Sequence, residues 1–143
     1  MLSKLNENVL KDNQEEILSL LESVENNKQY CQNKIKDLFE YVNSKDTFLY
    51  GHICDNKIIS FLWCYKRIYN NTERLHISFL AVNNDFQRRG LAKELINKVF
   101  DILDSTDIDF IDLNVNPNNK AAIKLYQSLG FYEESKLLKF RKE

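Results

Sequence analysis

The chain has 143 residues, which suits one domain with its own core, and its 43% hydrophobic and 29% charged residues are ordinary for a globular protein. Its net charge of −1 provides no electrostatic footprint for nucleic acid. Zinc is not expected, because the three cysteines lack C-x-x-C spacing and only two histidines are present, and no other metal is expected. The thiols are predicted to be reduced. No signal peptide is recognisable and no apolar run is long enough to span a bilayer. We therefore expect a cytoplasmic protein that binds neither membrane nor nucleic acid.

Two helices are predicted in the first part of the chain, after a short ambiguous stretch in which residues 2–5 are a candidate edge strand. The first begins at an N-cap on Asp12 or Asn13, and the second follows the break at Asn26–Asn27. Apolar residues recur at helical spacing in both, at Ile17, Leu18, Leu20, Leu21 and Val24 and at Ile35, Leu38, Phe39 and Val42. Neither helix carries obvious chemistry, and we expect both to cover a sheet.

A β-hairpin is predicted next, because residues 48–54 and 58–69 are rich in aromatic and branched side chains and flank a polar turn at 55–57. Alternation predicts one shared face for Phe61, Trp63, Tyr65 and Tyr69. Such a stripe is more often core than substrate contact. Cys54 and Cys64 lie in apolar surroundings and are expected to be small core residues.

The stretch from 74 to 104 predicts a strand, a short loop and a helix. Alternation in the strand places His76, Ser78, Leu80 and Val82 on one face. After the polar turn at 83–85 the period becomes helical, with apolar residues at Leu91, Leu95, Ile96, Val99, Ile102 and Leu103.

The start of this helix has the chemistry of an anion site. The first backbone N–H groups of a helix lack internal partners, and the helix dipole is positive there, so the end attracts phosphate. Gly90 allows close approach, Ala92 keeps the next turn nearly bare, and Arg88 and Arg89 add charge. A P-loop is disfavoured because no G-K-S/T follows, and a dinucleotide fingerprint because one glycine is present where three are needed. The alternative to an anion site is an ordinary helix start with a pair of solvated charges.

The last third predicts a strand at 108–115, parallel to the strand at 74–82 across the intervening helix, and a final helix opened by residues 116–119. That helix buries Ala122, Leu125 and Leu129 and stops at Gly130. Two closing strands are predicted at 131–134 and 136–141. No linker or repeat interrupts the chain, so residues 1–143 are expected to form a single domain.

The residues Gln87-x-x-Gly90-x-Ala92 after the strand end resemble the R/Q-x-x-G-x-G/A motif of the GNAT superfamily of acetyl-CoA-dependent N-acetyltransferases. A second stretch is similar to the family pattern N-x-x-A-x-x-x-Y-x-x-x-G-F, with Asn119, Ala122, Tyr126, Gly130 and Phe131. The two motifs stand in family order. The resemblance implies an α/β (α+β) three-layer fold, with a mixed sheet of about six to seven strands, about four helices, and two strands splayed at the cofactor cleft.

The resemblance also implies roles for individual residues. The cofactor-binding set it implies is Leu80, Val82, Gln87, Arg88, Arg89, Gly90, Leu91, Ala92, Asn119 and Tyr126. Tyr126 matches the family's general acid. Without the resemblance, an aromatic residue on that helix face would be interpreted as a core residue, and Asn119 would be interpreted as a helix N-cap. His76 lies where the family often places a base, and Glu73 is the alternative base. The non-catalytic interpretation is that His76 is a hydrogen-bonded structural residue. The role of Asn114 is left open.

The function implied is acetyl transfer from acetyl-CoA, as co-substrate, to a primary amine by direct transfer in a ternary complex. The pantetheine arm would lie along the backbone of Leu80 and Val82, whose amide would face the thioester oxygen. The acceptor is an amine on a small molecule, an antibiotic or a peptide. The alternative is a catalytically silent GNAT-fold sensor or interaction module that binds acetyl-CoA. The sequence identifies neither the acceptor nor the oligomeric state, for which a homodimer is one option.

Overall fold

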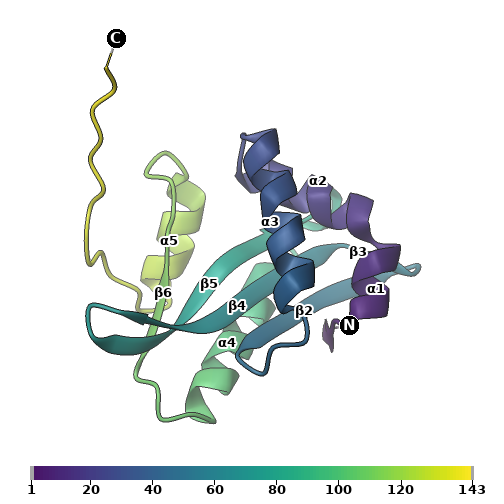
Figure 1. The fold of residues 1–143 in the computed structure, drawn as a ribbon, viewed down its shortest axis with the longest axis horizontal. Helices are drawn as coiled ribbons and strands as arrows, with labels where there is room; N and C mark the ends of the chain where they lie inside the picture. Colours follow the sequence, from purple (N-terminus) through teal and green to yellow (C-terminus); the bar gives the residue numbers. More distant parts are fainter. Residues whose placement is uncertain (1, 143) are drawn as a thin grey trace. The chain divides into compact units, whose positions relative to one another are not determined.

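The computed structural model describes residues 2–142 and contains a mixed sheet with helices on both faces (Figure 1). In chain order the elements are β1 (Leu2–Lys4), α1 (Glu7–Asp12), α2 (Gln14–Val24), α3 (Lys28–Tyr41), β2 (Thr47–Cys54), β3 (Lys57–Ile58), β4 (Ser60–Tyr69), β5 (Thr72–Val82), a 3-10 turn η1 (Asn84–Phe86), α4 (Leu91–Asp104), β6 (Phe110–Leu113) and α5 (Lys120–Ser128). The contacts divide the chain into two compact units, one ending at Leu113 and one starting at Asn114. The single-domain organisation therefore stays a prediction.

The sheet belongs to the first unit and has the strand order β1-β2-β4-β5-β6, with β3 paired to β2. All neighbours are antiparallel except β5 and β6, which run parallel with Arg74 opposite Phe110 and Ile77 opposite Leu113. The predicted parallel step across α4 and the mixed six-stranded sheet are thus confirmed. The prediction of about four helices is one short of the five that the structure describes.

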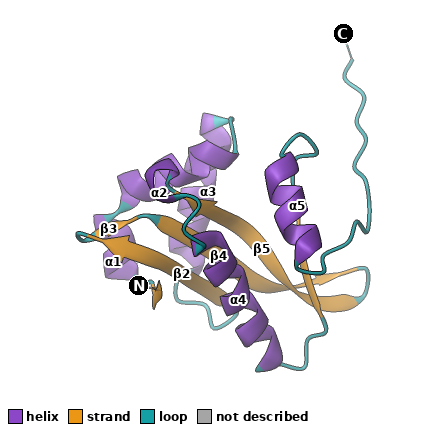
Figure 2. Cartoon of the chain, turned by 180° about the vertical axis from the view of Figure 1, so that it is seen from behind, coloured by secondary structure: helices purple, strands orange, loops and turns teal. Residues whose placement is uncertain are grey.

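Helices α1–α3 cover one face of the sheet and α4 covers the other (Figures 1 and 2). Two hydrophobic cores result. The core under α1–α3 includes Ile17, Leu21, Leu38, Leu49, Phe61, Trp63 and Phe79, and the core under α4 includes Leu62, Cys64, Leu75, Ile77, Leu95, Val99 and Ile102. None of the described helices is long and apolar enough to cross a membrane.

The N-terminal region contains a helix that the sequence pattern did not predict. The short helix α1 is capped by Asn6, whose side-chain oxygen accepts from the amide of Val9. The edge strand at residues 2–4 is confirmed. Asn13 does stand at the N-cap position of α2, but its side chain makes no cap bond there. Its oxygen accepts from the amide of Ile58 and its nitrogen donates to the carbonyl of Val9, so this buried side chain fastens β3 to α1.

A β-bulge in β5 corrects the predicted face of His76. Along β4, Trp63 lies opposite Phe79 and the next residue, Cys64, lies opposite Ile77, so Ser78 is the extra residue. His76 therefore shares a face with Phe79 in the α1–α3 layer. Leu80 and Val82 pack instead against the core under α4, so the predicted common face of these residues is wrong. Strict alternation fails because one inserted residue inverts every later side chain.

The aromatic stripe of β4 is confirmed where it is covered by helices. Phe61 and Trp63 are buried and Tyr65 packs against them, whereas Tyr69, at the hairpin tip, is 40% exposed. The core prediction holds for Cys64, where burial raises the thiol pKa to about 12. It is wrong for Cys54, which is exposed at the end of β2.

The second unit begins at Asn114 and contains α5 with the residues before and after it. Asn119 caps α5 by accepting from the amide of Ala122, and Gly130 ends the helix in a left-handed conformation with φ of 99°. The two predicted closing strands are not formed among the described residues of 131–142. Leu137, Leu138 and Phe140 are almost fully exposed, so the described residues of this unit do not bury these apolar side chains. Asn114 follows the end of β6 and is exposed, rather than lying within a strand.

Candidate cofactor and catalytic sites

The loop between β5 and α4 turns sharply through two left-handed residues. Asn83 caps η1 by accepting from the amide of Asp85, and Arg88 and Gly90 then adopt φ values of 64° and 78°. Glycine takes this conformation without the strain that a side chain brings. A Cβ on Gly90 would meet no atom within 4 Å, so the loop is also open to solvent at this point.

The backbone amides from the end of the loop into the first turn of α4 have no recorded partner among the described residues. The hydrogen bonds of the loop end with the Gln87 amide on the Asn84 carbonyl and resume with the Glu94 amide on the Gly90 carbonyl. Among the described residues, no acceptor is recorded for the amides in between, from 88 to 93. These N–H groups lie at the positive end of a helix of 14 residues, which is a setting that binds phosphate.

Side chains around the loop brace it. Gln87 donates from Nε2 to the Val82 carbonyl and to Asn84 Oδ1, at 3.3 and 3.0 Å. The Arg89 guanidinium lies 5.0 Å from the ring centre of Phe86. Gln87, Arg88, Arg89 and Gly90 are exposed, while Leu91 and Ala92 are half-buried. Gln87 thus supports the loop backbone through its side chain.

The first turn of α4 is tied to the sheet by a buried histidine that sequence reasoning missed. His52 Nε2 lies 3.3 Å from Glu94 Oε1, and its Nδ1 lies 2.6 Å from Ser60 Oγ. His52 and Ser60 are both buried. No local pattern marked these residues, because they meet only across β2, β4 and α4.

The edge of β5 next to this loop has free backbone groups. The Asn83 amide donates toward the β4 side, to the Ile59 carbonyl at 2.8 Å. Since amides alternate in direction along a strand, those of Leu80 and Val82 point to the opposite edge. Strand β6 pairs with β5 only as far as Ile77, so no described strand of this unit covers that edge. An extended ligand can add to such an edge by main-chain hydrogen bonds.

His76 lies where β5 and β6 are still paired. Its ring is buried and makes a T-shaped contact with Tyr65, at 5.3 Å between ring centres, and its Nδ1 lies 2.8 Å from Asp112 Oδ1. Burial lowers the pKa of His76 below its ordinary value, the charges of Arg67 and Lys34 lower it further, and the Asp112 hydrogen bond opposes them. The imidazole is therefore neutral at physiological pH, as a base must be.

Asp112 lies beside His76 and was not singled out by the sequence patterns. Its Oδ2 accepts from Arg67 Nη2 at 2.7 Å and lies 3.5 Å from Arg74 Nη1. Burial by itself would raise the pKa of Asp112, but the hydrogen bonds from Arg67 and His76 outweigh it, and the pKa is lowered. The sequence did contain a signal for Asp112, because a carboxylate is unusual within an otherwise apolar strand.

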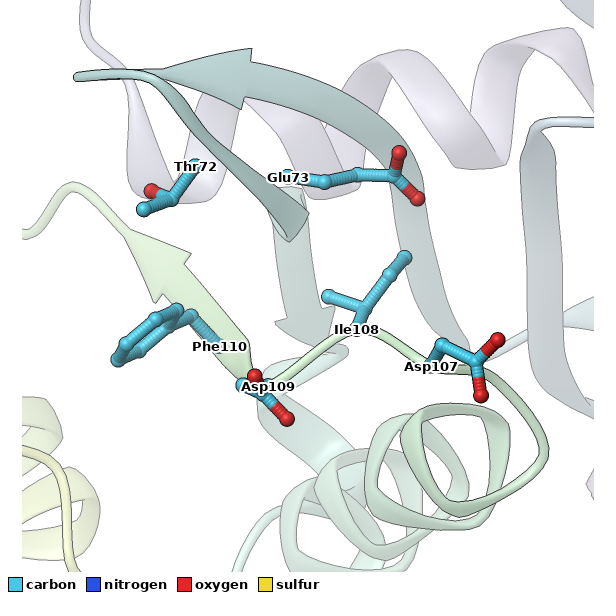
Figure 3. A pocket seen from close by; sticks show the side chains of 6 residues that line it. All are labelled: Thr72, Glu73, Asp107, Ile108, Asp109 and Phe110. Atoms are coloured by element: carbon cyan, nitrogen blue, oxygen red, sulfur yellow. The ribbon is translucent and has the colours of Figure 1, made fainter.

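Glu73, the alternative base, lies elsewhere on the same strand. It is exposed near the hairpin turn and lines a depression of about 280 Å³ where β5 and β6 begin (Figure 3). The other lining residues are Thr72, Asp107, Ile108, Asp109 and Phe110. Residues 87–92, called the anion loop below, follow the opposite end of β5, so this depression is separate from them.

Tyr126 and Asn119 belong to the second unit. Tyr126 is half-buried on α5, and its ring centre lies 5.6 Å from that of Phe131. Burial raises the pKa of Tyr126, so the phenol keeps its proton at neutral pH. The Asn119 side chain is exposed and forms the α5 cap.

Comparison with known proteins identifies the family. The sequence profile of the Acetyltransferase (GNAT) family matches residues 13–131. This chain therefore belongs to the GNAT acetyltransferase family, and the resemblance seen in the two motifs is confirmed.

Curated relatives match over parts of the chain. It is 30% identical over 90 residues to N-alpha-acetyltransferase 30 of Xenopus laevis. The aligned segment covers 63% of this chain and 32% of the relative. The chain is 46% identical over 54 residues to the [Ribosomal protein bS18]-alanine N-acetyltransferase of Salmonella typhimurium, over 38% of this chain and 36% of the relative. The chain thus spans about a third of the length of these relatives.

Solved structures match over nearly the whole length. An aminoglycoside acetyltransferase from an uncultured soil metagenomic sample, in complex with sisomicin, matches with a TM-score of 0.74 and 21% identity, over 100% of this chain and 95% of that one. The aminoglycoside N-acetyltransferase AAC(6')-Iy in complex with CoA matches with a TM-score of 0.75 and 19% identity, over 99% and 93%. At this identity the likeness shows that the fold is shared.

Proposed function

We propose that this protein transfers an acetyl group from acetyl-CoA to a primary amine in a ternary complex. The observation that carries the proposal is the run of amides from 88 to 93, which have no recorded partner among the described residues and follow the uncovered edge of β5 by a few residues. An anion-binding helix start and a free strand edge, adjacent in the chain, suit a ligand that combines a diphosphate with an extended amide-containing arm. Membership of the GNAT family supports this assignment.

The residues of the chain fit the co-substrate at both ends. The loop amides, with Arg88 and Arg89 at the rim, would hold the diphosphate. The amides of Leu80 and Val82 point to the open edge and would hold the pantetheine arm, with the Val82 amide facing the thioester oxygen. Acetyl-CoA supplies the activated acetyl group, and the protein supplies position and polarity.

His76 would act as the base and Tyr126 as the acid. One proton passes from the acceptor ammonium to Nε2 of His76, and the freed amine forms the C–N bond to the acetyl carbon as the C–S bond breaks. The departing sulfur takes the phenol proton of Tyr126, and the second amine proton replaces it through solvent. A neutral His76 and a protonated Tyr126 are the required starting forms, and the two pKa shifts favour both. We prefer His76 to Glu73 because Glu73 lies at the exposed start of β5.

The acceptor is best sought among two classes. Sequence relatives include a protein named for the alanine of ribosomal protein bS18, and structural neighbours include aminoglycoside acetyltransferases. A thiol-release assay should therefore compare peptides with free N-terminal amines, aminoglycosides and simple alkylamines. Acetyl-CoA binding without release of thiol on any of these amines would favour the alternative, a silent acetyl-CoA sensor or interaction module.

Replacing Tyr126 by phenylalanine tests the proposed acid. Tyr126→Phe removes one oxygen and keeps the ring contact with Phe131, so we expect kcat to fall by about 10²-fold or more while the acetyl-CoA dissociation constant changes little. Steady-state kinetics and calorimetry measure the two quantities. Tyr132→Phe, at an exposed tyrosine in the same unit, is the matched control. Unchanged turnover in Tyr126→Phe would remove Tyr126 from the mechanism.

A further inference from the structure

The Asp112 cluster, which consists of Arg67, Arg74, His76 and Asp112, joins three strands of the sheet. Parallel pairing places Asp112 of β6 directly opposite His76 of β5. One carboxylate oxygen meets the His76 ring at Nδ1, and the other meets Arg67 from β4 and Arg74 from β5. The Asp112 side chain is only 15% exposed, so these contacts replace most of its water.

The two oxygens of Asp112 thus have different partners. Arginine has no acceptor and stays protonated, so Arg67 and Arg74 can only donate to Oδ2. These donors favour an ionised Asp112, and an ionised carboxylate can only accept. The hydrogen shared at 2.8 Å with His76 therefore belongs to Nδ1 of the ring.

A neutral imidazole that carries its proton on Nδ1 has its lone pair on Nε2. Among the described residues no hydrogen-bond partner is recorded for Nε2 of His76. Among the described residues, the charged and titratable groups recorded around the ring are Asp112 from β6, Arg67 and Tyr65 from β4, Arg74 from β5, and Lys34 from α3. Asp112 is the carboxylate in this recorded set.

We propose that Asp112 is a positioning residue, which holds His76 in the Nδ1–H tautomer so that Nε2 is available as the base. This inference rests on the proposed function for the role of Nε2. The negative charge of Asp112 stabilises the imidazolium that forms when Nε2 takes the acceptor's proton. Arg67 and Arg74 keep Asp112 ionised, so the proton stays on the ring and does not pass to the carboxylate.

The substitution Asp112→Asn separates this role from simple packing. In the variant, Arg67 and Arg74 can bond only the amide oxygen, so the amide nitrogen must turn toward His76. That nitrogen donates, which requires a lone pair on Nδ1 and moves the ring proton to Nε2. The variant therefore preserves the shape of the side chain and inverts the histidine tautomer.

Nitrogen NMR of the histidine rings measures the tautomer without any need for activity. The chain has only two histidines, and His76→Gln assigns their signals. We expect the Nδ1–H form for His76 in the wild type and the Nε2–H form in Asp112→Asn. Asp101→Asn, at an exposed carboxylate on α4, should leave the spectrum unchanged. An Nε2–H or doubly protonated His76 in the wild type at neutral pH would overturn the proposal, even if Asp112→Asn does not fold.

A double-mutant cycle tests whether Asp112 acts through His76. We expect Asp112→Asn to lower kcat by about 10²-fold or more in the wild-type background, with an unchanged acetyl-CoA dissociation constant, and to have no further effect in the His76→Gln background. Equal losses in both backgrounds would show that Asp112 has a purely structural role. A wild-type protein with the expected tautomer but no transfer to any amine would refute the proposed function and leave the tautomer assignment standing.

Discussion

The anion loop (residues 87–92) and the Asp112 cluster are both candidate parts of one reaction, but they are built in opposite ways. The loop is exposed at residues 87–90 and half-buried at Leu91 and Ala92, spans six consecutive residues and presents backbone amides. The Asp112 cluster is largely buried, joins residues up to 45 positions apart and works through side chains. The first is specified by local sequence, whereas the second depends on strand register.

This difference teaches where each kind of site is sensitive to change. A backbone site tolerates many side chains but not a changed φ angle or a blocked approach. A side-chain cluster fails when one partner is removed, because the remaining buried charges lose their compensation. The two regions should therefore respond separately to substitution, with cofactor affinity changed at the loop and the protonation of His76 changed in the Asp112 cluster.

The largest effect is expected for Gly90→Glu. The new carboxylate repels a diphosphate at the loop amides, and a non-glycine residue at φ of 78° adds roughly 1–2 kcal/mol of strain. We expect the acetyl-CoA dissociation constant to rise by at least about 100-fold, or about 2.7 kcal/mol, in titration calorimetry. Gly90→Ala is the matched control, since it brings the strain without the charge and its methyl group meets no atom within 4 Å. Wild-type affinity in Gly90→Glu would refute the loop assignment.

An intermediate effect is expected for Arg67→Met, which keeps the length of the side chain and removes its charge. Loss of the charged hydrogen bond to Asp112 should lower the free energy of unfolding by about 1.5–3 kcal/mol. The positive charge of Arg67 lowers the pKa of His76, so its removal raises that pKa. The acid limb of the kcat/KM profile should therefore move to higher pH, with unchanged acetyl-CoA affinity. Arg67→Lys should retain most of the profile, and a limb that moves to lower pH in Arg67→Met would contradict the assignment of His76 as base.

The smallest effect is expected in the pH dependence of stability. Because the folded pKa of His76 is lowered, the unfolded chain, with a histidine pKa near 6.5, binds the proton more readily. Stability from the neutral ring is complete above about pH 6.5 and is lost as pH falls through the folded pKa. In urea denaturation at pH 7.5 and 5.5, His76→Gln should lose less stability on acidification than the wild type. Gly90→Ala should keep the wild-type difference, and an identical loss in His76→Gln would contradict the lowered pKa.

The fold was largely predictable where the pattern is local. Helical apolar spacing predicted α2, α3, α4 and α5, and the polar pairs Asp55–Asn56 and Asn70–Asn71 mark turns in which all four residues have positive φ. The short helix α1 was missed because its apolar stripe is too brief to register. The closing strands at 131–134 and 136–141 were predicted from the local sequence, but a strand also depends on packing against neighbouring strands and on burial.

The sequence alone determined the strand, short loop and helix around residues 87–92, because a polar stretch with a glycine before an apolar helical stripe is a property of neighbouring residues. Family membership followed from two such local motifs. Only the tertiary structure decided the surroundings of His76. The bulge at Ser78 determines the face of the sheet on which His76 lies, and the parallel register of β5 and β6 places Asp112 beside the His76 ring. Strand register depends on the packing of the whole sheet, which no single stretch of the chain contains.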